Sequence, residues 1–195
     1  MSDEENIIII DCGNCKHVYF SGIIDTVNAT ALCANLVGLD FEMQNRRGEF
    51  GFKQGEETLE VDLSIKLHIN STGGNISPAF MIADTIDTLV TPVDCHVDDR
   101  CASAAVIAFL AGRNRTMAPH SIIAVHETMH SVESVSFSDI KEFGKDAKDI
   151  YEEIVDFYCE KTGKSRREIR KMFKDCTHIK ASEATDLGFC RIVKS

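Results

Sequence analysis

A serine and a histidine in this chain have the surroundings that nucleophilic catalysis needs. Ser103 follows small residues, and the apolar run after it predicts a helix whose positive end lies beside the hydroxyl. His126 closes a second apolar run, residues 122–125, which predicts a buried strand that carries the imidazole at its tip. A serine hydroxyl becomes an effective nucleophile when an adjacent base takes its proton. The two residues therefore predict a serine hydrolase, provided that the fold brings them together.

A glycine turn, Asn70-Ser71-Thr72-Gly73-Gly74, follows an alternating stretch at 65–69 that predicts a strand. Glycine lets the backbone approach a reacting carbonyl closely, and backbone N–H groups stabilise the oxyanion that forms there. The turn is thus a candidate oxyanion-binding element.

Strand and helix patterns alternate along the chain, which predicts an α/β fold with a largely parallel sheet. Polar, glycine-punctuated residues at about 44–61 predict an inserted hairpin or mobile loop. Strands are predicted at 7–10, 18–20, 65–69, 93–97 and 121–125. Helices are predicted at 27–42, at 77–89, from Ser103 onward, at 137–161 and at 165–173. One more helix turn is predicted within 181–188, before a final strand.

The length of 195 residues predicts one domain spanning residues 1–195. A net charge of −10 argues against nucleic acid or an anionic membrane as partner, and no apolar stretch is long enough to span a bilayer. The acidic N-terminus differs from a secretory signal, so we expect a cytoplasmic protein whose eight cysteines are reduced.

Cys12 and Cys15, with His17 nearby, could form half of a zinc site, but no second Cys-x-x-Cys accompanies them, so incidental thiols are favoured.

Several segments, in their order and spacing, resemble the ClpP family, the proteolytic subunits of the Clp protease within the ClpP/crotonase group. Thr72 stands where the family's glycine motif usually has proline. The resemblance implies a ClpP/crotonase-like fold of repeated ββα units with a largely parallel sheet and a protruding long helix, here 137–161, that packs between stacked rings. The matching segments are 17–22, 69–74, 102–104, 119–126 and 181–188.

The resemblance also assigns roles within the site, with no metal or cofactor. Ser103 would be the nucleophile and His126 the general base. The backbone N–H groups of Gly74 and Ala104 would form the oxyanion hole. The substrate would lie extended beside the glycine strand, next to the substrate-binding residues Gly73 and Asn75.

The carboxylate that orients the imidazole is where this sequence departs from the family. Alignment on Ala181 places Cys176 at that position, whereas counting forward from His126 favours Asp175. A local bulge at 175–178 would restore the geometry, so we predict Asp175 as the third member.

The implied function is that of a serine endopeptidase that hydrolyses unfolded proteins or peptides. It would form a homo-oligomer, a heptameric ring or double ring, and work with an AAA+ unfoldase. The short N-terminal segment and the 44–61 insertion indicate a divergent member, similar to phage-type head maturation proteases. A catalytically silent ClpP-like subunit is an alternative, and so is a crotonase-type acyl-CoA enzyme, although that chemistry calls for a pair of glutamates in the pocket.

Overall fold

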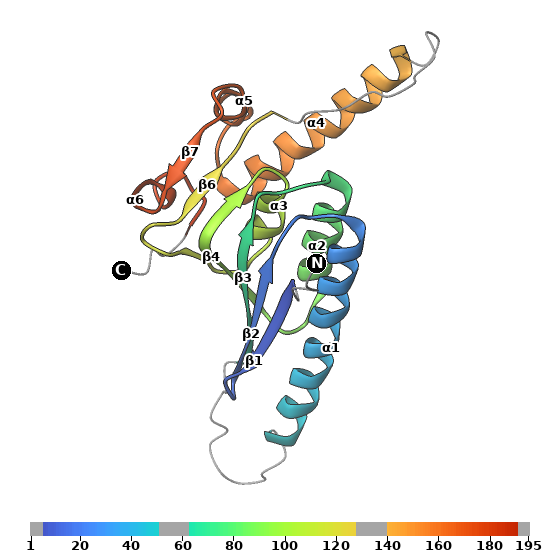
Figure 1. Ribbon diagram of the computed structural model, residues 1–195, viewed down its shortest axis with the longest axis vertical. Helices are drawn as coiled ribbons and strands as arrows, with labels where there is room; N and C mark the ends of the chain where they lie inside the picture. Colours follow the sequence, from blue (N-terminus) through green and yellow to red (C-terminus); the bar gives the residue numbers. More distant parts are fainter. Residues whose placement is uncertain (1–5, 51–62, 128–139, 191–195) are drawn as a thin grey trace, which may run out of the picture.

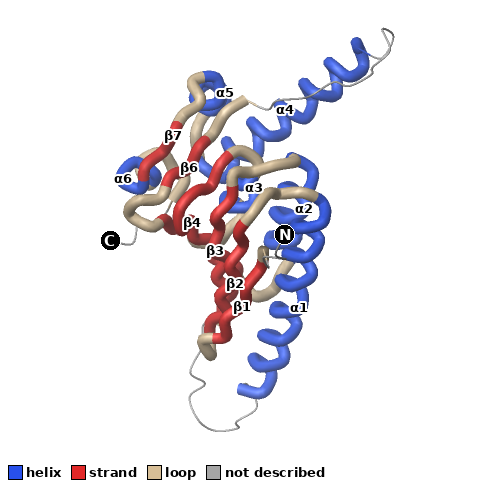
Figure 2. The backbone as a smooth tube through the Cα atoms, viewed as in Figure 1, coloured by secondary structure: helices blue, strands red, loops and turns tan. Residues whose placement is uncertain are grey.

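The computed structural model describes residues 6–50, 63–127 and 140–190, and within them a seven-stranded sheet forms the centre of the molecule (Figures 1 and 2). The pairs β2–β3, β3–β4, β4–β5 and β4–β6 are parallel, whereas the outer pairs β1–β2 and β6–β7 are antiparallel. The predicted α/β fold with a largely parallel sheet is therefore confirmed. The strands are β1 (Ile7–Asp11), β2 (Cys15–Ser21), β3 (Ser64–Ser71), β4 (Val93–Ala102), β5 (Arg115–Met117), β6 (Ile122–Ala124) and β7 (His178–Lys180), in the order β1-β2-β3-β4-β6-β7 with β5 beside β4.

Two helices, α1 and α2, lie side by side along one face of the sheet, and α4 projects away from the body of the molecule (Figure 1). No helix within the described ranges combines the length and the apolarity that crossing a bilayer requires. The helices are α1 (Thr26–Phe50), α2 (Ile76–Thr88), α3 (Ala105–Leu110), α4 (Ile140–Thr162), α5 (Arg166–Lys174) and α6 (Ala181–Ala184).

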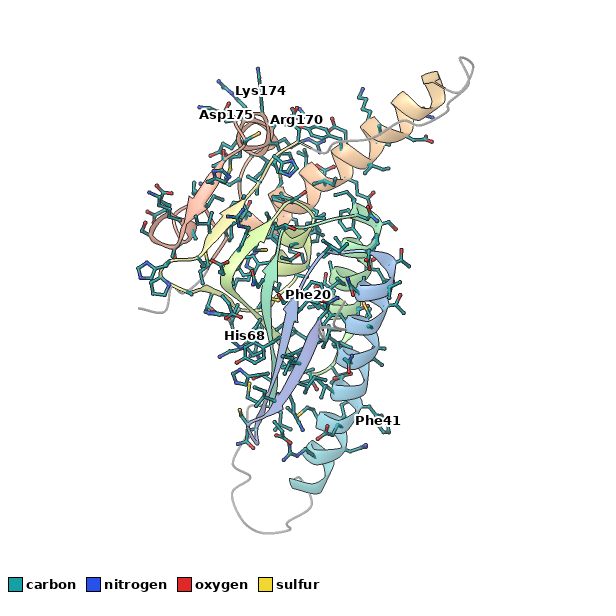
Figure 3. All side chains as sticks on the ribbon, viewed as in Figure 1. Phe20, Phe41, His68, Arg170, Lys174 and Asp175 are labelled. Atoms are coloured by element: carbon teal, nitrogen blue, oxygen red, sulfur yellow. The ribbon has the colours of Figure 1, made fainter. Side chains whose placement is uncertain are left out.

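Alternation along β3 separates a buried face from an open one. Ile65, Leu67 and Ile69 are buried and belong to one apolar core with Leu32 and Leu36 of α1. Burial of each such side chain stabilises the fold by about 1.5 to 3 kcal/mol. The polar residues between them lie on the opposite face of the sheet, where Figure 3 places His68.

The prediction of a loop from residue 44 onward is wrong for residues 44–50, because α1 continues to Phe50. The extension is fastened to the β1–β2 hairpin. Buried Lys16 forms ion pairs with Asp11 at 2.6 Å and with Glu42 of α1 at 2.7 Å, and Arg46 Nη1 donates to the Gly13 carbonyl at 2.8 Å. These tertiary contacts stabilise the helical conformation of residues 44–50, although the polar local sequence favours a loop. Residues 51–62, the rest of the predicted insertion, lie outside the described residues.

Helix α5 confirms the helix predicted at 165–173. Ser165 is its N-cap and forms a capping box with Glu168. Helix α4 likewise confirms the long helix over the residues that are described, whereas residues 137–139 lie outside them. Residues 191–195, which follow the predicted last helix turn, also lie outside the described residues. The sequence did not predict β5 and β7, since neither contains an apolar run like the one that predicted the equally short β6.

Asp40 joins α1 to the connection between α2 and β4. Its carboxylate is buried and accepts from Thr91 N at 2.6 Å and from Gln44 Nε2 at 2.8 Å. Burial by itself raises the pKa of Asp40, but the hydrogen bonds from Thr91, Val90 and Gln44 outweigh burial and hold the pKa below its ordinary value.

A carboxylate with a lowered pKa stabilises the fold above its unfolded-state pKa and loses that contribution as the pH falls through its folded-state pKa. We therefore expect Asp40→Asn to lower the free energy of unfolding by about 1.5 to 3 kcal/mol near neutral pH. Urea denaturation should show this difference shrinking below about pH 4, where the unfolded carboxyl takes up its proton. A difference that is independent of pH would mean that the charge on Asp40 is not its source.

Candidate active site

Ser103 lies at a sharp turn between β4 and α3. Its φ of +54° is in the left-handed region, which is uncommon for a residue other than glycine. The Ser103 N–H donates to the Ala124 carbonyl of β6 at 2.9 Å, so the turn is held from the neighbouring strand. Strained backbone of this kind persists where the surroundings impose it, and such positions cluster at functional sites.

The glycine turn at the end of β3 packs directly against Ser103. A Cβ on Gly73 would lie 2.6 Å from the Ala102 carbonyl oxygen and 2.7 Å from Ser103 Cβ, and the φ of Gly73 is +96°. A Cβ on Gly74, whose φ is +153°, would lie 2.1 Å from the Ile24 carbonyl oxygen. Both positions therefore require glycine, and the structure brings the predicted oxyanion turn to the predicted nucleophile.

The pairing of the glycine turn with Ile24 does not use the N–H of Gly74. Ile24 N donates to the Gly73 carbonyl at 2.8 Å and Asn75 N donates to the Ile24 carbonyl at 2.7 Å. Among the residues that the structure describes, neither Gly74 N–H nor Ala104 N–H donates to a protein acceptor. Asn75 is the N-cap residue of α2, and its side chain makes no capping hydrogen bond.

His126 follows β6, the strand that pairs with the end of β4. Its Nδ1 lies 2.7 Å from the carbonyl oxygen of Glu127, so Nδ1 carries the proton that is donated there. In the neutral ring this leaves a lone pair on Nε2, the form that a general base needs. Within the described part of the chain, no hydrogen bond joins His126 to Ser103 or to Asp175.

Asp175 and Cys176 occupy the connection between α5 and β7. Asp175 is the exposed C-cap residue of α5, at the end of the helix that Figure 3 labels together with Lys174 and Arg170. Cys176 has a φ of +48°. Val125 N donates to the Thr177 carbonyl at 3.0 Å, which extends the antiparallel β6–β7 pairing by one residue, up to the residue before His126 and the residue after Cys176. The third member stays a prediction.

The two thiols on β4 are not alternative nucleophiles. Cys101, two residues before Ser103, is fully buried, and burial raises its pKa well above the ordinary value. Burial likewise raises the pKa of Cys95 on the same strand to about 12. Both are therefore neutral packing residues near neutral pH.

Potential metal ligands gather away from these residues. Among the described residues, the group of three that could hold an ion consists of His68, His96 and Asp98. Cys12 and Cys15 are not part of such a group, although both are described.

The fold and the Ser103 turn define a ClpP-type architecture. The structure aligns with that of a ClpP1 mutant from Listeria monocytogenes with a TM-score of 0.74 over 92% of this chain and 91% of the other, at 22% sequence identity. The model of the Clp protease family matches residues 57–195, and the chain therefore belongs to the Clp protease family.

Two similar relatives are both named ATP-dependent Clp protease proteolytic subunit 1. The protein from Chlamydia abortus is 32% identical over 123 residues, which are 62% of this chain and 64% of the relative. The protein from Thermobifida fusca is 26% identical over 134 residues, 68% of this chain and 60% of the relative. The matches thus span slightly less than two thirds of the relatives' own length.

Proposed function

We propose that this chain is a serine endopeptidase of the Clp type, with Ser103 as nucleophile and His126 as general base. The observation that carries the proposal is the strained Ser103 turn packed against Gly73. A residue chosen only for close packing would not need a left-handed backbone, since alanine in an ordinary helix packs equally closely. Membership of a protease family disfavours the acyl-CoA alternative.

In the proposed reaction, Ser103 Oγ attacks the carbonyl carbon of a peptide bond and His126 Nε2 takes the hydroxyl proton. The unused N–H groups of Gly74 and Ala104 would donate to the oxyanion, each contributing about 3 to 4 kcal/mol to the barrier reduction. His126 then gives the proton to the leaving amine, and water releases the acyl group from Ser103. This sequence requires His126 to turn toward Ser103 when substrate binds.

The substrate would be an extended, unfolded polypeptide that lies beside the glycine turn, near Gly73 and Asn75. Backbone pairing recognises an extended chain without a strong demand on side chains, which suits a protease of broad specificity. The proposed assembly is a homo-oligomeric ring or double ring, with α4 between rings and an AAA+ unfoldase as partner. The projection of α4 from the body supports this role (Figure 1).

Labelling with a fluorophosphonate probe tests the proposal. We expect a single adduct per chain, and peptide mapping should place it on Ser103, because only an activated serine attacks the phosphorus. No adduct in a folded, ring-forming sample would contradict the proposal and favour a catalytically silent subunit.

Asp175→Asn compared with Cys176→Ala tests the third member of the triad. We expect Asp175→Asn to lower kcat/KM by about 100-fold or more, because loss of the orienting carboxylate leaves the imidazole misaligned. Cys176→Ala should stay within about twofold of wild type. Initial rates on a fluorogenic peptide measure both, and the reverse pattern would assign the role to Cys176.

A further inference from the structure

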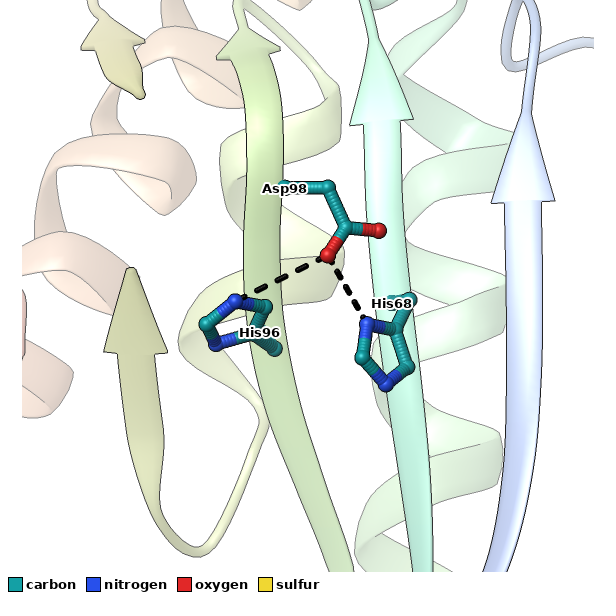
Figure 4. A group of neighbouring side chains, drawn as sticks. All are labelled: His68, His96 and Asp98. Carbon is teal, nitrogen blue, oxygen red and sulfur yellow. Dashed lines mark hydrogen bonds and ion pairs between the residues drawn. The ribbon is translucent and has the colours of Figure 1, made fainter. Parts of the chain in front are cut away.

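Two histidines and an aspartate meet on the open face of the sheet, away from the Ser103 turn. His68 on β3 and His96 on β4 are direct partners in the parallel register, and Asp98 follows His96 by two residues on the same face (Figure 4). Alternation along each strand thus presents all three side chains on the side opposite the apolar core.

The distances among the three side chains match those of a metal site. His68 Nδ1 lies 2.9 Å and His96 Nε2 lies 3.6 Å from the same oxygen, Asp98 Oδ1, and the three atoms all lie within 4.8 Å of one another. Ligands of tetrahedral Zn²⁺ at about 2.1 Å from the ion stand about 3.4 Å apart. Small side-chain rotations would therefore place an ion between them.

The second nitrogen of each ring has a hydrogen-bonding partner that can accept its proton. His96 Nδ1 lies 2.6 Å from Thr116 Oγ1, and His68 Nε2 lies 2.9 Å from Nδ1 of His17. In this structure His68 Nδ1 donates to the Asp98 carboxylate, which can only accept, so an ion would have to displace that proton. Protons on the outer nitrogens would then turn the lone pairs of both rings toward the ion, and such outer contacts fix the tautomer of metal-bound histidines.

Neighbouring side chains restrict the two histidine rings, and the site remains accessible to solvent at Asp98. The side chains of His68 and His96 are only 12% and 15% exposed, whereas that of Asp98 is 38% exposed. Tyr19 stacks on the His68 ring at a centroid distance of 4.2 Å, which limits its rotation. A solvent molecule could complete the coordination on the open side of Asp98.

We propose that His68, His96 and Asp98 bind a divalent transition-metal cation, for which Zn²⁺ is the best match. Two imidazoles and one carboxylate are a common ligand set for zinc. The sequence analysis considered only the cysteine pair as a metal site, and the absence of a metal that the resemblance implies stays a prediction.

A bound ion would join β3 to β4 just before both strands enter the candidate active site. The register of the two strands shifts between the pairs Ile69–Val97 and Ser71–Cys101, and Asp98 lies in the longer segment of β4. Beyond this point β3 leads to the glycine turn and β4 to Ser103. The ion would fix the spacing of the two strands at the irregular point.

Titration of the full chain with Zn²⁺ by isothermal calorimetry, after chelation and buffer exchange, tests the site. We expect one ion per chain, with the affinity lowered about 100-fold or more in His68→Asn and in His96→Asn. The exposed His120→Asn is the matched control and should bind as wild type does. Circular dichroism in the presence of chelator verifies that each variant is folded.

A double variant, Cys12→Ser with Cys15→Ser, separates this site from the cysteine pair. We expect it to bind Zn²⁺ as wild type does, and we expect Co²⁺ bound to wild type to lack the near-ultraviolet band of a cobalt–thiolate bond. Loss of binding in the cysteine variant, or equal affinity in the two ligand variants and wild type, would overturn the proposal.

Zinc should also raise the thermal unfolding temperature, because the ion binds the assembled strands and not the unfolded chain. At a hundredfold excess over Kd we expect a rise of about 5 °C or more in wild type and His120→Asn, and none in His96→Asn. These readouts do not use peptidase activity, so the metal site and the peptidase proposal can fail independently.

Discussion

Replacing Ser103 by alanine is expected to abolish peptide hydrolysis, with a fall in kcat on the order of 10⁴- to 10⁶-fold. The reason is that the proposed reaction passes through a covalent acyl group on Ser103 Oγ, and alanine has no nucleophile to form it. Initial rates on a fluorogenic peptide measure the loss. The same variant should lose the fluorophosphonate adduct.

The matched control is Ser182→Ala, which removes a hydroxyl from an exposed position on α6. It should keep wild-type rates and the adduct. Thermal denaturation should show that Ser103→Ala remains folded, because alanine is smaller than serine and adds no clash, and the left-handed backbone is strained in both residues. Turnover retained in a pure, folded Ser103→Ala sample would contradict the assignment of Ser103 as the nucleophile.

The second large effect is expected for Gly73→Ala. The added Cβ would lie 2.6 Å from the Ala102 carbonyl oxygen and 2.7 Å from Ser103 Cβ, and the contacting atoms belong to backbone and to the nucleophile itself. The glycine turn must therefore move away from Ser103. We expect kcat to fall by about 10²- to 10³-fold, as for loss of one oxyanion donor, and the free energy of unfolding to fall by about 1 to 3 kcal/mol.

Gly38→Ala on α1 is the control for the added methyl group, because a Cβ there meets no atom within 4 Å. It should leave kcat unchanged and stabilise the helix by up to about 1 kcal/mol. Kinetics and urea denaturation of the two variants make the comparison. If Gly73→Ala retained wild-type kcat, the glycine turn would not be part of the catalytic site.

Local signals in the sequence determined the fold class, the family and the position of the candidate nucleophile. The alternation at 65–69, the small residues before Ser103 and the Ser165 cap each act over a few residues, so they can be recognised along the chain. The glycine turn was predictable for the same reason, since a Gly-Gly pair directly after a strand pattern marks a turn in the local sequence.

Contacts between distant residues could be decided only by the tertiary structure. The extension of α1 to Phe50 depends on Arg46 and Glu42 meeting the β1–β2 hairpin, which local polarity does not reveal. The approach of the segment after Cys176 to the segment before His126 likewise depends on the register between β6 and β7.

The group of His68, His96 and Asp98 is the clearest example of residues that only the tertiary structure brings together. His68 and Asp98 belong to separate strands, and nothing in the spacing between them indicates a shared ligand geometry. Alternation alone could have placed His68 on the open face of β3 and His96 on the open face of β4. Their meeting depends on the parallel register that pairs these two residues directly, and a shift of one residue would point one ring into the core. Strand register is a property of the packed sheet, and it is therefore the tertiary structure that brings these ligands together.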